Sequence, residues 1–433
     1  MSYFHRSYSV AVTAFALAFG TAPSRAQVTV IRAGAIVDPA TGTTRRNQVI
    51  VIAGTTIQAV GADLAVPAGA TVIDLSDLVV LPGLFDVHTH LGSAVNTAVT
   101  VLKAYTVDVP TAFRAIQGAV NAKDVLEAGF TTIRDVGNSG NYGDAAVKSA
   151  IETGMIPGPN MLISGKIIAP FGGQFIVAPE FPDVGLQDYI YADTRDELQK
   201  GIRQNIHFGA DWIKIVVDDQ RYIYSADDIR FVVDEAARAG LRVAAHSYTD
   251  RGARNAIEAG VASIEHGFDM SDETLRMAKE QGVVLVGTNL AEHIVPIWEG
   301  FGAATMPMMS TDPEEQRDLY AQIVDRLERA HRIGVEMAYG ADVYMKVPGH
   351  THGTAALENI HTWVDAGIPA EDILRALTTN GARLLGMESQ RGALEPGMIA
   401  DIIATTDNPL DRIETLKQVR FVMKSGVVVR ERR

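Results

Sequence analysis

The chain contains no cysteine among its 433 residues. Disulfide bonds are therefore excluded, and so are the thiolate ligands that hold many zinc and iron–sulfur sites. Any metal ion would have to be bound by histidine, aspartate, glutamate or a modified lysine. The fold must rest on an ordinary apolar core, which a hydrophobic fraction of 47% can supply.

Positive charge is also scarce. Lysine and arginine number 38 against 52 aspartate and glutamate residues, so the formal net charge is −14 at pH 7. Nucleic acids and anionic lipid surfaces are bound by basic patches. We therefore expect neither nucleic acid nor a membrane as a partner.

The sequence lacks apolar runs of the length that crosses a membrane. A shorter apolar run lies near the N-terminus. Residues 1–26 carry the basic Arg6, an apolar run over residues 10–19 and a small residue, Ala26, at their end. This order is typical of a secretory signal peptide that is cleaved after Ala26. A membrane anchor is the alternative, but a run of about ten residues is too short to span a bilayer. The pattern predicts a periplasmic or secreted mature protein.

Eight short apolar segments recur along the chain with helical patterns between them. They cover residues 83–90, 131–136, 161–167, 212–217, 242–247, 263–267, 283–289 and 336–342. Several intervening helices are expected to end at glycine, and Ser225 and Ser271 stand at expected N-cap positions. Eight consecutive β-then-α units predict an α/β fold, the (β/α)8 TIM barrel. A doubly wound open sheet is the alternative, but the sequence lacks its glycine-rich loop after the first strand.

Two β-rich flanks surround these units. Residues 27–82 and 392–433 contain short strand patterns separated by glycine, aspartate and proline turns. No linker or low-complexity tract separates them from the rest. The flanks are predicted to meet as one small composite β-sandwich, with the barrel over residues 83–391.

The stretch "FDVHTH", residues 85–90, places two histidines one residue apart at the end of an apolar run. Residues i and i+2 of a strand point to the same side, so His88 and His90 would leave one face together. Two neutral imidazoles side by side can bind a metal ion. The alternative is a pair of surface histidines in a loop.

Other ionisable groups fall in or at the ends of later strands, and barrel enzymes carry their chemistry at the C-terminal strand ends. These groups are Lys214, His246, His266 and Asp342. A single strand-end histidine is more often a structural residue than a ligand. A lysine within an apolar strand, however, is costly to bury unless it is paired or neutralised. Together with His88 and His90, the groups favour one shared site.

These residues resemble the amidohydrolase superfamily in its two-metal form with a carboxylated lysine. The resemblance rests on "FDVHTH", the lysine of "DWIKI", "AAHS", "SIEHG" and "GAD". It extends over nearly all of residues 27–433 through "GFTTIRDVGN", "GAIVDPATG" and "LEPGMIADII". Within the superfamily the chain is most similar to the Xaa-Pro and Xaa-Arg dipeptidase group, which also contains amidases of N-acyl amino acids such as ochratoxin hydrolases. The resemblance implies an enzyme that hydrolyses the amide bond of a dipeptide or an N-acyl amino acid.

The resemblance also implies two divalent metal ions, and zinc is expected from the nitrogen and oxygen ligands. His88, His90 and Asp342 would hold one ion, and His246 and His266 the other. Lys214, as a carbamate, would bridge both ions together with a hydroxide. Asp342 would also act in catalysis by passing the proton of the nucleophile to the leaving amine.

Further residues are expected to contact the substrate. Tyr224 matches a tyrosine that contacts substrate in relatives and is expected to be catalytic, with Tyr222 as the competing choice. Gln174, in "IIAPFGGQF", stands where the dipeptidase group often has a histidine, and its amide can donate a hydrogen bond but cannot titrate.

Several cations follow the predicted strands. His293 follows the seventh strand, and His352 follows the eighth, where it matches a "HG" of the family. Arg221 and His352, with Lys166 behind them, are candidates to bind a substrate carboxylate. His350 lies close to His352 in the sequence. Three further histidines are expected to be surface or packing residues of helices: His207, His331 and His361.

Two long apolar loops follow the third and seventh strands. The first carries Phe171, Phe175, Phe181 and Tyr189, and the second carries Trp298, Phe301 and three methionines. Such loops can line a pocket for a bulky apolar group, or they can pack on each other or on another subunit. We expect a homo-oligomer with a small-molecule amide or peptide substrate. A lactonase, phosphotriesterase or cyclic-amide hydrolase on the same metals is an alternative, as is a non-catalytic binding protein, although the complete ligand set speaks against the latter.

Overall fold

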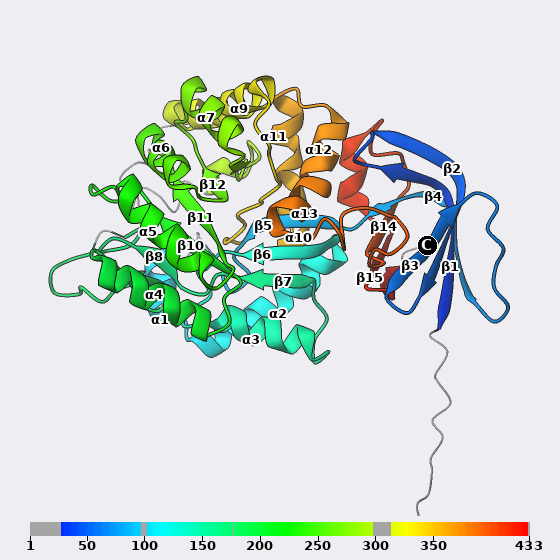
Figure 1. Cartoon of the computed structure of the whole chain (residues 1–433), viewed down its shortest axis with the longest axis horizontal. Coiled ribbons are helices and arrows are strands. Elements are labelled where there is room, and N and C mark those ends of the chain that lie inside the picture. The colour runs from blue at the N-terminus through cyan, green and yellow to red at the C-terminus, as the bar shows by residue number, and fades with distance from the viewer. Residues whose placement is uncertain (1–26, 97–101, 176, 298–312, 432–433) are drawn as a thin grey trace, which may run out of the picture.

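The computed structural model describes residues 27–96, 102–175, 177–297 and 313–431. The predicted signal peptide, residues 1–26, lies outside this range. Helices surround a group of parallel strands in one part of the molecule, and a seven-stranded sheet forms the other end (Figure 1).

The seven-stranded sheet unites the two flanks of the chain. Its order is β16-β15-β14-β4-β1-β2-β3, and β14 pairs antiparallel with β4, so that Ile402 lies opposite Pro82. The strands are β1 (Val28–Asp38), β2 (Thr43–Ala53), β3 (Thr56–Gly61), β4 (Thr71–Pro82), β14 (Ile402–Thr405), β15 (Phe421–Lys424) and β16 (Val427–Glu431). An apolar cluster with members from β1 and β2 as well as β14 and β15 stabilises the junction. The two flanks thus meet within one seven-stranded sheet. The sequence had predicted that they meet as a small β-sandwich.

The central strands are parallel and form two sheets, β5-β6-β7 and β13-β12-β11-β10-β8-β9. The strands are β5 (Leu84–Thr89), β6 (Phe130–Asp135), β7 (Asn160–Ile163), β8 (Ile167–Ala169), β9 (Tyr189–Tyr191), β10 (Trp212–Val216), β11 (Arg242–Ser247), β12 (Ser263–His266) and β13 (Val284–Val286). The predicted third strand is divided into β7 and β8 around Gly165, which has a φ of +67°. Strands that are buried on both faces read as continuous apolar runs, as predicted for α/β architecture.

The eighth predicted strand, residues 336–342, is not a regular strand but a bridging segment. Leu285 N donates to Glu336 O at 2.9 Å, and Asp342 N donates to His88 O at 2.8 Å. The segment thus lies between β13 and β5. A side chain at Gly340 would approach Cβ of His88 to 2.7 Å, so glycine is required for this close passage.

Helices connect most of the successive parallel strands and pack on their outer side (Figure 1). They are α1 (Leu102–Asp108), α2 (Thr111–Glu127), α3 (Gly143–Glu152), α4 (Arg195–His207), α5 (Ala226–Ala237), α6 (Asp250–Ala259), α7 (Asp272–Gln281), α9 (Pro313–Ile333), α10 (His352–Glu358), α11 (Ile360–Asp365), α12 (Ala370–Ala376), α13 (Thr379–Leu385) and the 3-10 helix η1 (Ile413–Gln418). Ser225 and Ser271 cap α5 and α7 through their side chains, as predicted. Gly260 and Gly282 end α6 and α7 in the left-handed conformation.

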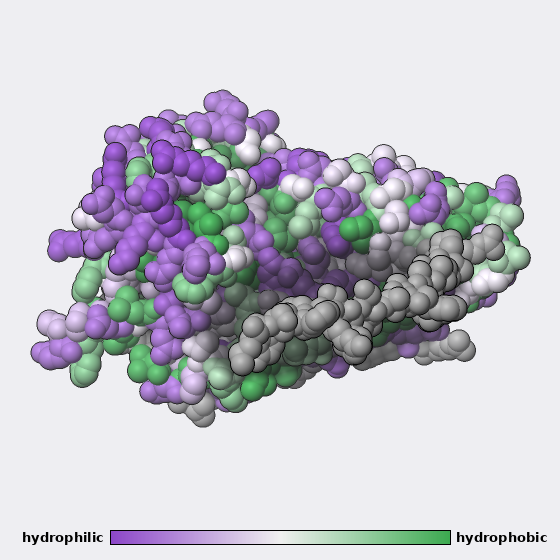
Figure 2. Space-filling model, turned by 60° about the horizontal axis from the view of Figure 1, so that its bottom comes forward, coloured by the Kyte–Doolittle hydropathy of each residue, from purple (hydrophilic) through white to green (hydrophobic). Residues whose placement is uncertain are grey.

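The surface is mixed in character. On the face shown in Figure 2, hydrophilic residues gather over the end of the molecule that lies away from the seven-stranded sheet. No helix in the described ranges has both the length and the apolar composition that crossing a membrane requires.

Candidate metal centre and active site

The structure brings all six predicted metal ligands to one small cavity. The lining residues are His88, His90, Asn138, Ile167, Gln174, Lys214, His246, Tyr248, His266, Asp342 and Tyr344. Each ligand candidate is at most 8% exposed. They come from β5, β10, β11, β12 and the bridging segment 336–342, so one strand end after another contributes to the site.

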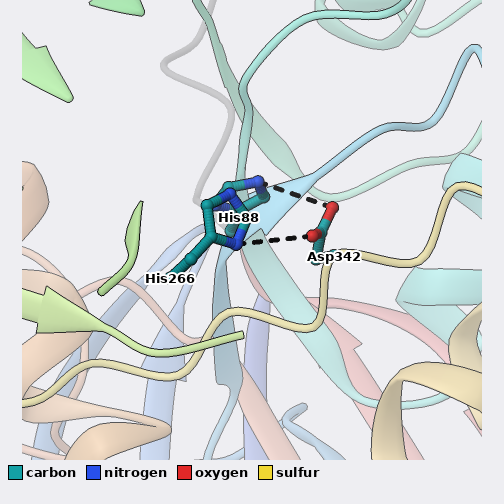
Figure 3. A group of neighbouring side chains, drawn as sticks. All are labelled: His88, His266 and Asp342. Atoms are coloured by element: carbon teal, nitrogen blue, oxygen red, sulfur yellow. Dashed lines mark ion pairs between the residues drawn. The ribbon is translucent and has the colours of Figure 1, made fainter. Parts of the chain in front are cut away.

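Asp342 stands at the centre of three histidines. Its Oδ1 lies 3.2 Å from Nε2 of His90 and 3.5 Å from Nε2 of His88. Its Oδ2 lies 3.8 Å from Nδ1 of His266, and the side chains of His88, His266 and Asp342 point toward one another (Figure 3). Burial alone would raise the pKa of Asp342, but the surrounding His88 and His90 imidazoles lower it below its usual range. The carboxylate is therefore ionised and can accept a proton or bind a cation.

Two of these residues adopt a strained backbone. His266 has a φ of +71° and Asp342 a φ of +53°, in the left-handed region that non-glycine residues seldom occupy. Such a conformation costs on the order of 1–3 kcal/mol and persists where the surroundings enforce it. The strain aims both side chains into the cavity, which is typical of a functional site.

Lys214 is the unusual member of the group. Its side chain lies within the buried strand β10, and its Nζ has no hydrogen-bond partner among the described residues. Burial lowers the pKa of Lys214 to about 8, which makes the neutral amine accessible near physiological pH. An unpartnered ammonium is costly in such a place, whereas a carbamate would form an anion between the histidines. The residues therefore fit a carboxylated lysine with two metal ions.

Hydrogen bonds select which ring nitrogen of each histidine faces the cavity. Nδ1 of His90 donates to the carbonyl of Gly137 at 2.8 Å, and Nδ1 of His266 lies 2.7 Å from Oγ1 of Thr288. Burial lowers the pKa of His88 to about 4 and that of His266 well below its usual value. The neutral imidazoles of His88 and His266 therefore have a lone pair available for a metal ion.

A buried ion pair, which the sequence did not reveal, supports the imidazole of His88. Nδ1 of His88 lies 2.6 Å from Oε2 of Glu265, whose Oε1 accepts from Nη2 of Arg134 at 2.7 Å. The Arg134 guanidinium also lies over the Trp212 ring, 4.6 Å from its centroid. Both charges lie within apolar strands, and this was the available signal, because a buried charge needs a partner.

Two acids after β10 were also missed. Asp219 Oδ1 lies 2.8 Å from Nε2 of His246, and Oδ2 accepts from Nε2 of Gln174 at 2.5 Å. Asp218 accepts four hydrogen bonds from residues 247–249. Tyr248 and Tyr344 line the cavity as well, and neither was predicted. Acids that directly follow a strand carrying a candidate ligand could have been flagged from the sequence.

The prediction for Tyr224 is not supported by its position. Its side chain is buried, and its hydroxyl donates to the carbonyl of Ala192 at 2.5 Å. Tyr224 is therefore used in packing and does not line the cavity. The competing Tyr222 is 53% exposed and does not line it either.

Of the predicted substrate residues, only Gln174 lines the cavity. Arg221 is exposed, and His293 lies 3.7 Å from Glu358, outside the cavity. His352 is buried at the start of α10, and burial lowers its pKa to about 3. Nζ of Lys166 donates to the carbonyl of Leu186 at 2.7 Å. Three further histidines fall in helices as predicted: His207, His331 and His361.

The first predicted apolar loop is split between the core and the surface. Phe175 and Tyr189 are buried, whereas Phe171 is 53% exposed and Phe181 is 67% exposed. The aromatic and methionine residues of the second loop, Trp298, Phe301, Met306, Met308 and Met309, lie outside the described residues.

Comparison with known proteins agrees with this site. The model of the amidohydrolase family matches residues 79–429. Ochratoxinase from Aspergillus niger is 28% identical over 435 residues, which cover 93% of this chain and 86% of the relative.

Solved structures give the same result. A Xaa-Pro dipeptidase with bound methionine in its active site is 30% identical, with a TM-score of 0.81 over 93% of this chain and 99% of the other. The structure of A. niger ochratoxinase is 25% identical, with a TM-score of 0.79 over 94% and 96% of the two chains. The resemblance inferred from the strand-end motifs is thus confirmed, and the chain belongs to the amidohydrolase family.

Proposed function

We propose that this enzyme hydrolyses the amide bond of a dipeptide or an N-acyl amino acid with the help of two divalent metal ions. The observation that carries the proposal is the buried Lys214 amine, which lacks a partner among the described residues and lies in one cavity with four histidines and Asp342. A purely structural cluster would pair this amine. A carbamate on Lys214 would give it partners on both sides of the cavity.

The ligands divide into two groups. His88, His90 and Asp342 would hold one ion, His246 and His266 the other, and carboxylated Lys214 would contact both. Zinc suits this set of nitrogen and oxygen donors. When bound, such ions lower the pKa of water and polarise the scissile carbonyl.

The protein's own groups manage orientation and proton transfer. Asp342 is ionised and stands between the histidines, so it can accept the proton of the attacking water and donate it to the leaving amine. Gln174 can donate a hydrogen bond to the reacting carbonyl from the wall of the cavity, which Tyr248 and Tyr344 also line.

The substrate class follows from the relatives and from the loop after β8. One relative is named an ochratoxinase and another a Xaa-Pro dipeptidase. Exposed Phe171 and Phe181 on that loop suit a bulky apolar group. A free carboxylate on the leaving amino acid is expected, although Arg221, His352 and Lys166 all lie outside the metal cavity. A lactone, phosphotriester or cyclic amide would use the same metal residues and is the alternative substrate.

The test is a comparison of substrates with metal-loaded protein. An aromatic dipeptide or an aryl-acyl phenylalanine should be cleaved about 10- to 150-fold faster than its C-terminal amide, because a charge-assisted hydrogen bond contributes roughly 1.5–3 kcal/mol. Equal rates would remove the carboxylate from the proposal. Hydrolysis restricted to lactones or phosphotriesters would overturn the amidase assignment.

Three structural proposals accompany this function. The parallel strands and the bridging segment 336–342 are interpreted as a closed (β/α)8 barrel, and the flanking sheet as its accessory domain. Residues 1–26 are proposed to direct export to the periplasm or outside the cell, which N-terminal sequencing of the mature protein would test. A homo-oligomer is proposed, and its test is the mass in solution.

A further inference from the structure

Three consecutive side chains after β10 hold the wall of the cavity together. Asp218 accepts from the hydroxyls of Ser247 and Thr249 at 2.7 and 2.6 Å. Gln220 donates from Nε2 to the carbonyl of Gly173 at 2.7 Å. Between them, Asp219 reaches toward the cavity. The three residues thus connect the loop after β8 with the loop after β11.

Asp219 contacts a candidate ligand with one oxygen and a cavity-wall residue with the other. Oδ1 lies 2.8 Å from Nε2 of His246, and Oδ2 lies 2.5 Å from Nε2 of Gln174. The Asp219 side chain is 6% exposed and the His246 side chain 3% exposed. Each contact is therefore made away from water, where hydrogen bonds to an ionised group are strong.

The direction of these hydrogen bonds is fixed by chemistry. An ionised carboxylate can only accept, so His246 carries its proton on Nε2, and Nδ1 is left with a lone pair. The amide of Gln174 is held at both ends, because its Oε1 accepts from the hydroxyl of Tyr189 at 2.8 Å. Tyr189 therefore donates to Gln174, and both Gln174 and His246 donate to Asp219.

We infer that Asp219 is a positioning residue of the metal site. It holds His246 in the tautomer whose Nδ1 can bind a metal ion, and it holds Gln174 against the cavity. This inference rests on the proposed two-metal function. Through Gln174 and His246, Asp219 connects the loop that carries Phe171 and Phe181 to one of the two proposed metal positions. Asp219 therefore orients both the loop and the ligand.

A role of Asp219 or Asp218 as a metal ligand is the competing assignment. Ligand atoms of Asp218, Asp219 and His246 lie within 4.8 Å of one another. The oxygens of Asp218, however, accept four hydrogen bonds, from Ser247, Tyr248 and Thr249. Both oxygens of Asp219 are likewise engaged by donors, as a supporting carboxylate would be.

The test is the metal affinity of Asp219→Asn, measured by metal content after dialysis against a graded series of chelator concentrations. An asparagine has one acceptor oxygen for the two donors that Asp219 accepts. If the oxygen accepts from Gln174, the amino group faces His246 and favours the tautomer with its proton on Nδ1. If the oxygen accepts from His246, the amino group meets the amino group of Gln174. We expect one of the two zinc ions to bind about 10- to 100-fold more weakly, the usual effect of losing such a support. Asp227→Asn is the matched control, because it removes the same charge from a side chain that is 78% exposed.

A compensating exchange sharpens the test. In the double variant Asp219→Asn with Gln174→Glu, the carboxylate and the amide trade places at the same net charge. The new glutamate accepts from Tyr189 and from the new asparagine, whose oxygen accepts from His246. Zinc affinity should return to within about threefold of the wild type, whereas Gln174→Glu alone, which sets two carboxylates face to face, should bind one ion more weakly.

The outcomes separate this inference from the proposed function. If the wild type binds fewer than two zinc ions per chain at saturation, the two-metal proposal fails. If the wild type binds two ions and Asp219→Asn holds both as tightly, the positioning role is wrong. Loss in Asp219→Asn without recovery in the double variant would also overturn it, because the hydrogen-bond direction would then be irrelevant. The double variant preserves charge and size, so it reports even if the single variant does not fold.

Discussion

Nδ1 of His88 lies 2.6 Å from Oε2 of Glu265, and neither side chain is more than 1% exposed. The carboxylate holds the proton on Nδ1 and leaves Nε2, 3.5 Å from Asp342, with a lone pair. The other oxygen of Glu265 is paired with Arg134. One buried carboxylate therefore stabilises the strands and also orients a proposed metal ligand.

Glu265→Gln should reveal both roles. Removing one partner of a buried ion pair leaves the Arg134 charge uncompensated, which costs about 3–5 kcal/mol in the free energy of unfolding. Metal affinity should also fall by about 10- to 100-fold. Denaturant unfolding of the metal-free protein and zinc titration measure the two effects.

The control is a second variant that adds Arg134→Met to Glu265→Gln. This change removes the unpaired charge, so stability should recover in part while metal affinity stays low. A Glu265→Gln variant that unfolds at the wild-type denaturant concentration would contradict the assignment of a buried ion pair.

Lys214 should make metal uptake depend on carbon dioxide and on pH. Its pKa is lowered to about 8, mainly by burial, so the neutral amine that reacts with carbon dioxide becomes common as the pH rises toward that value. Metal-free protein should therefore take up zinc faster at pH 8 than at pH 6.5, and bicarbonate should accelerate uptake. The rate of activity recovery in bicarbonate and in carbon-dioxide-free buffer measures this. Equal rates in both buffers would argue against a carbamate.

Lys214→Ala provides the complementary experiment. The variant should lose most of its metal and activity, because no bridging anion can form. Short carboxylic acids should restore part of both by occupying the space of the carbamate. Full metal content in the variant without any added acid would show that Lys214 does not bridge the ions.

Asp342→Asn should slow the chemistry while keeping the shape of the site. Its carboxylate is the proposed proton carrier, and general-base groups typically contribute about 10²–10⁴ in rate. We expect kcat to fall by about 10² or more. The comparison requires variant protein with its metal content verified, and a near-normal kcat in that protein would assign the proton transfer to another group.

His352 should make the protein less stable in acid. Burial, with a contribution from His90, lowers its pKa to about 3 in the folded chain. The unfolded chain takes up the proton below about pH 6.5, so the folded state loses relative stability as the pH falls from there toward 3, by up to about 1.4 kcal/mol per pH unit. The His352→Gln variant has no titrating group at this position and should not lose this stability. Between pH 7 and 5.5 the difference in unfolding free energy should shift by about 1 kcal/mol in favour of the variant, and parallel stability curves would refute a neutral buried histidine.

The six candidate ligands could be found in the sequence because their signal is local, and the structure places them in one cavity. Strand-end histidines at 88, 90, 246 and 266, with Lys214 and Asp342, follow from apolar runs that end in polar residues, and the fold alone brings them together. The support residues Glu265 and Asp219 depend on contacts across 177 and 27 positions of the chain, which no local pattern contains. Tyr224 was wrongly predicted to be catalytic. Its hydroxyl donates to the carbonyl of Ala192, which is again a non-local contact.

The strands predicted from apolar runs differ from the observed strands at two places. Gly165 divides the predicted third strand, and residues 336–342 pass between β13 and β5 without regular pairing. Positive φ angles at Asp342 and at Gly165 interrupt both segments, although their composition is that of strands. Backbone conformation of this kind is set by tertiary packing and is invisible in an apolar run.

The most direct measurement is a zinc titration of the metal-free enzyme with hydrolysis of an N-acyl aromatic amino acid as the readout. We predict negligible activity without metal and a rise that reaches its plateau at two zinc ions per chain. The same titration of the Lys214→Ala variant should stay flat. Full amide hydrolysis by metal-free protein, or a plateau that Lys214→Ala reaches as well, would contradict the central claim.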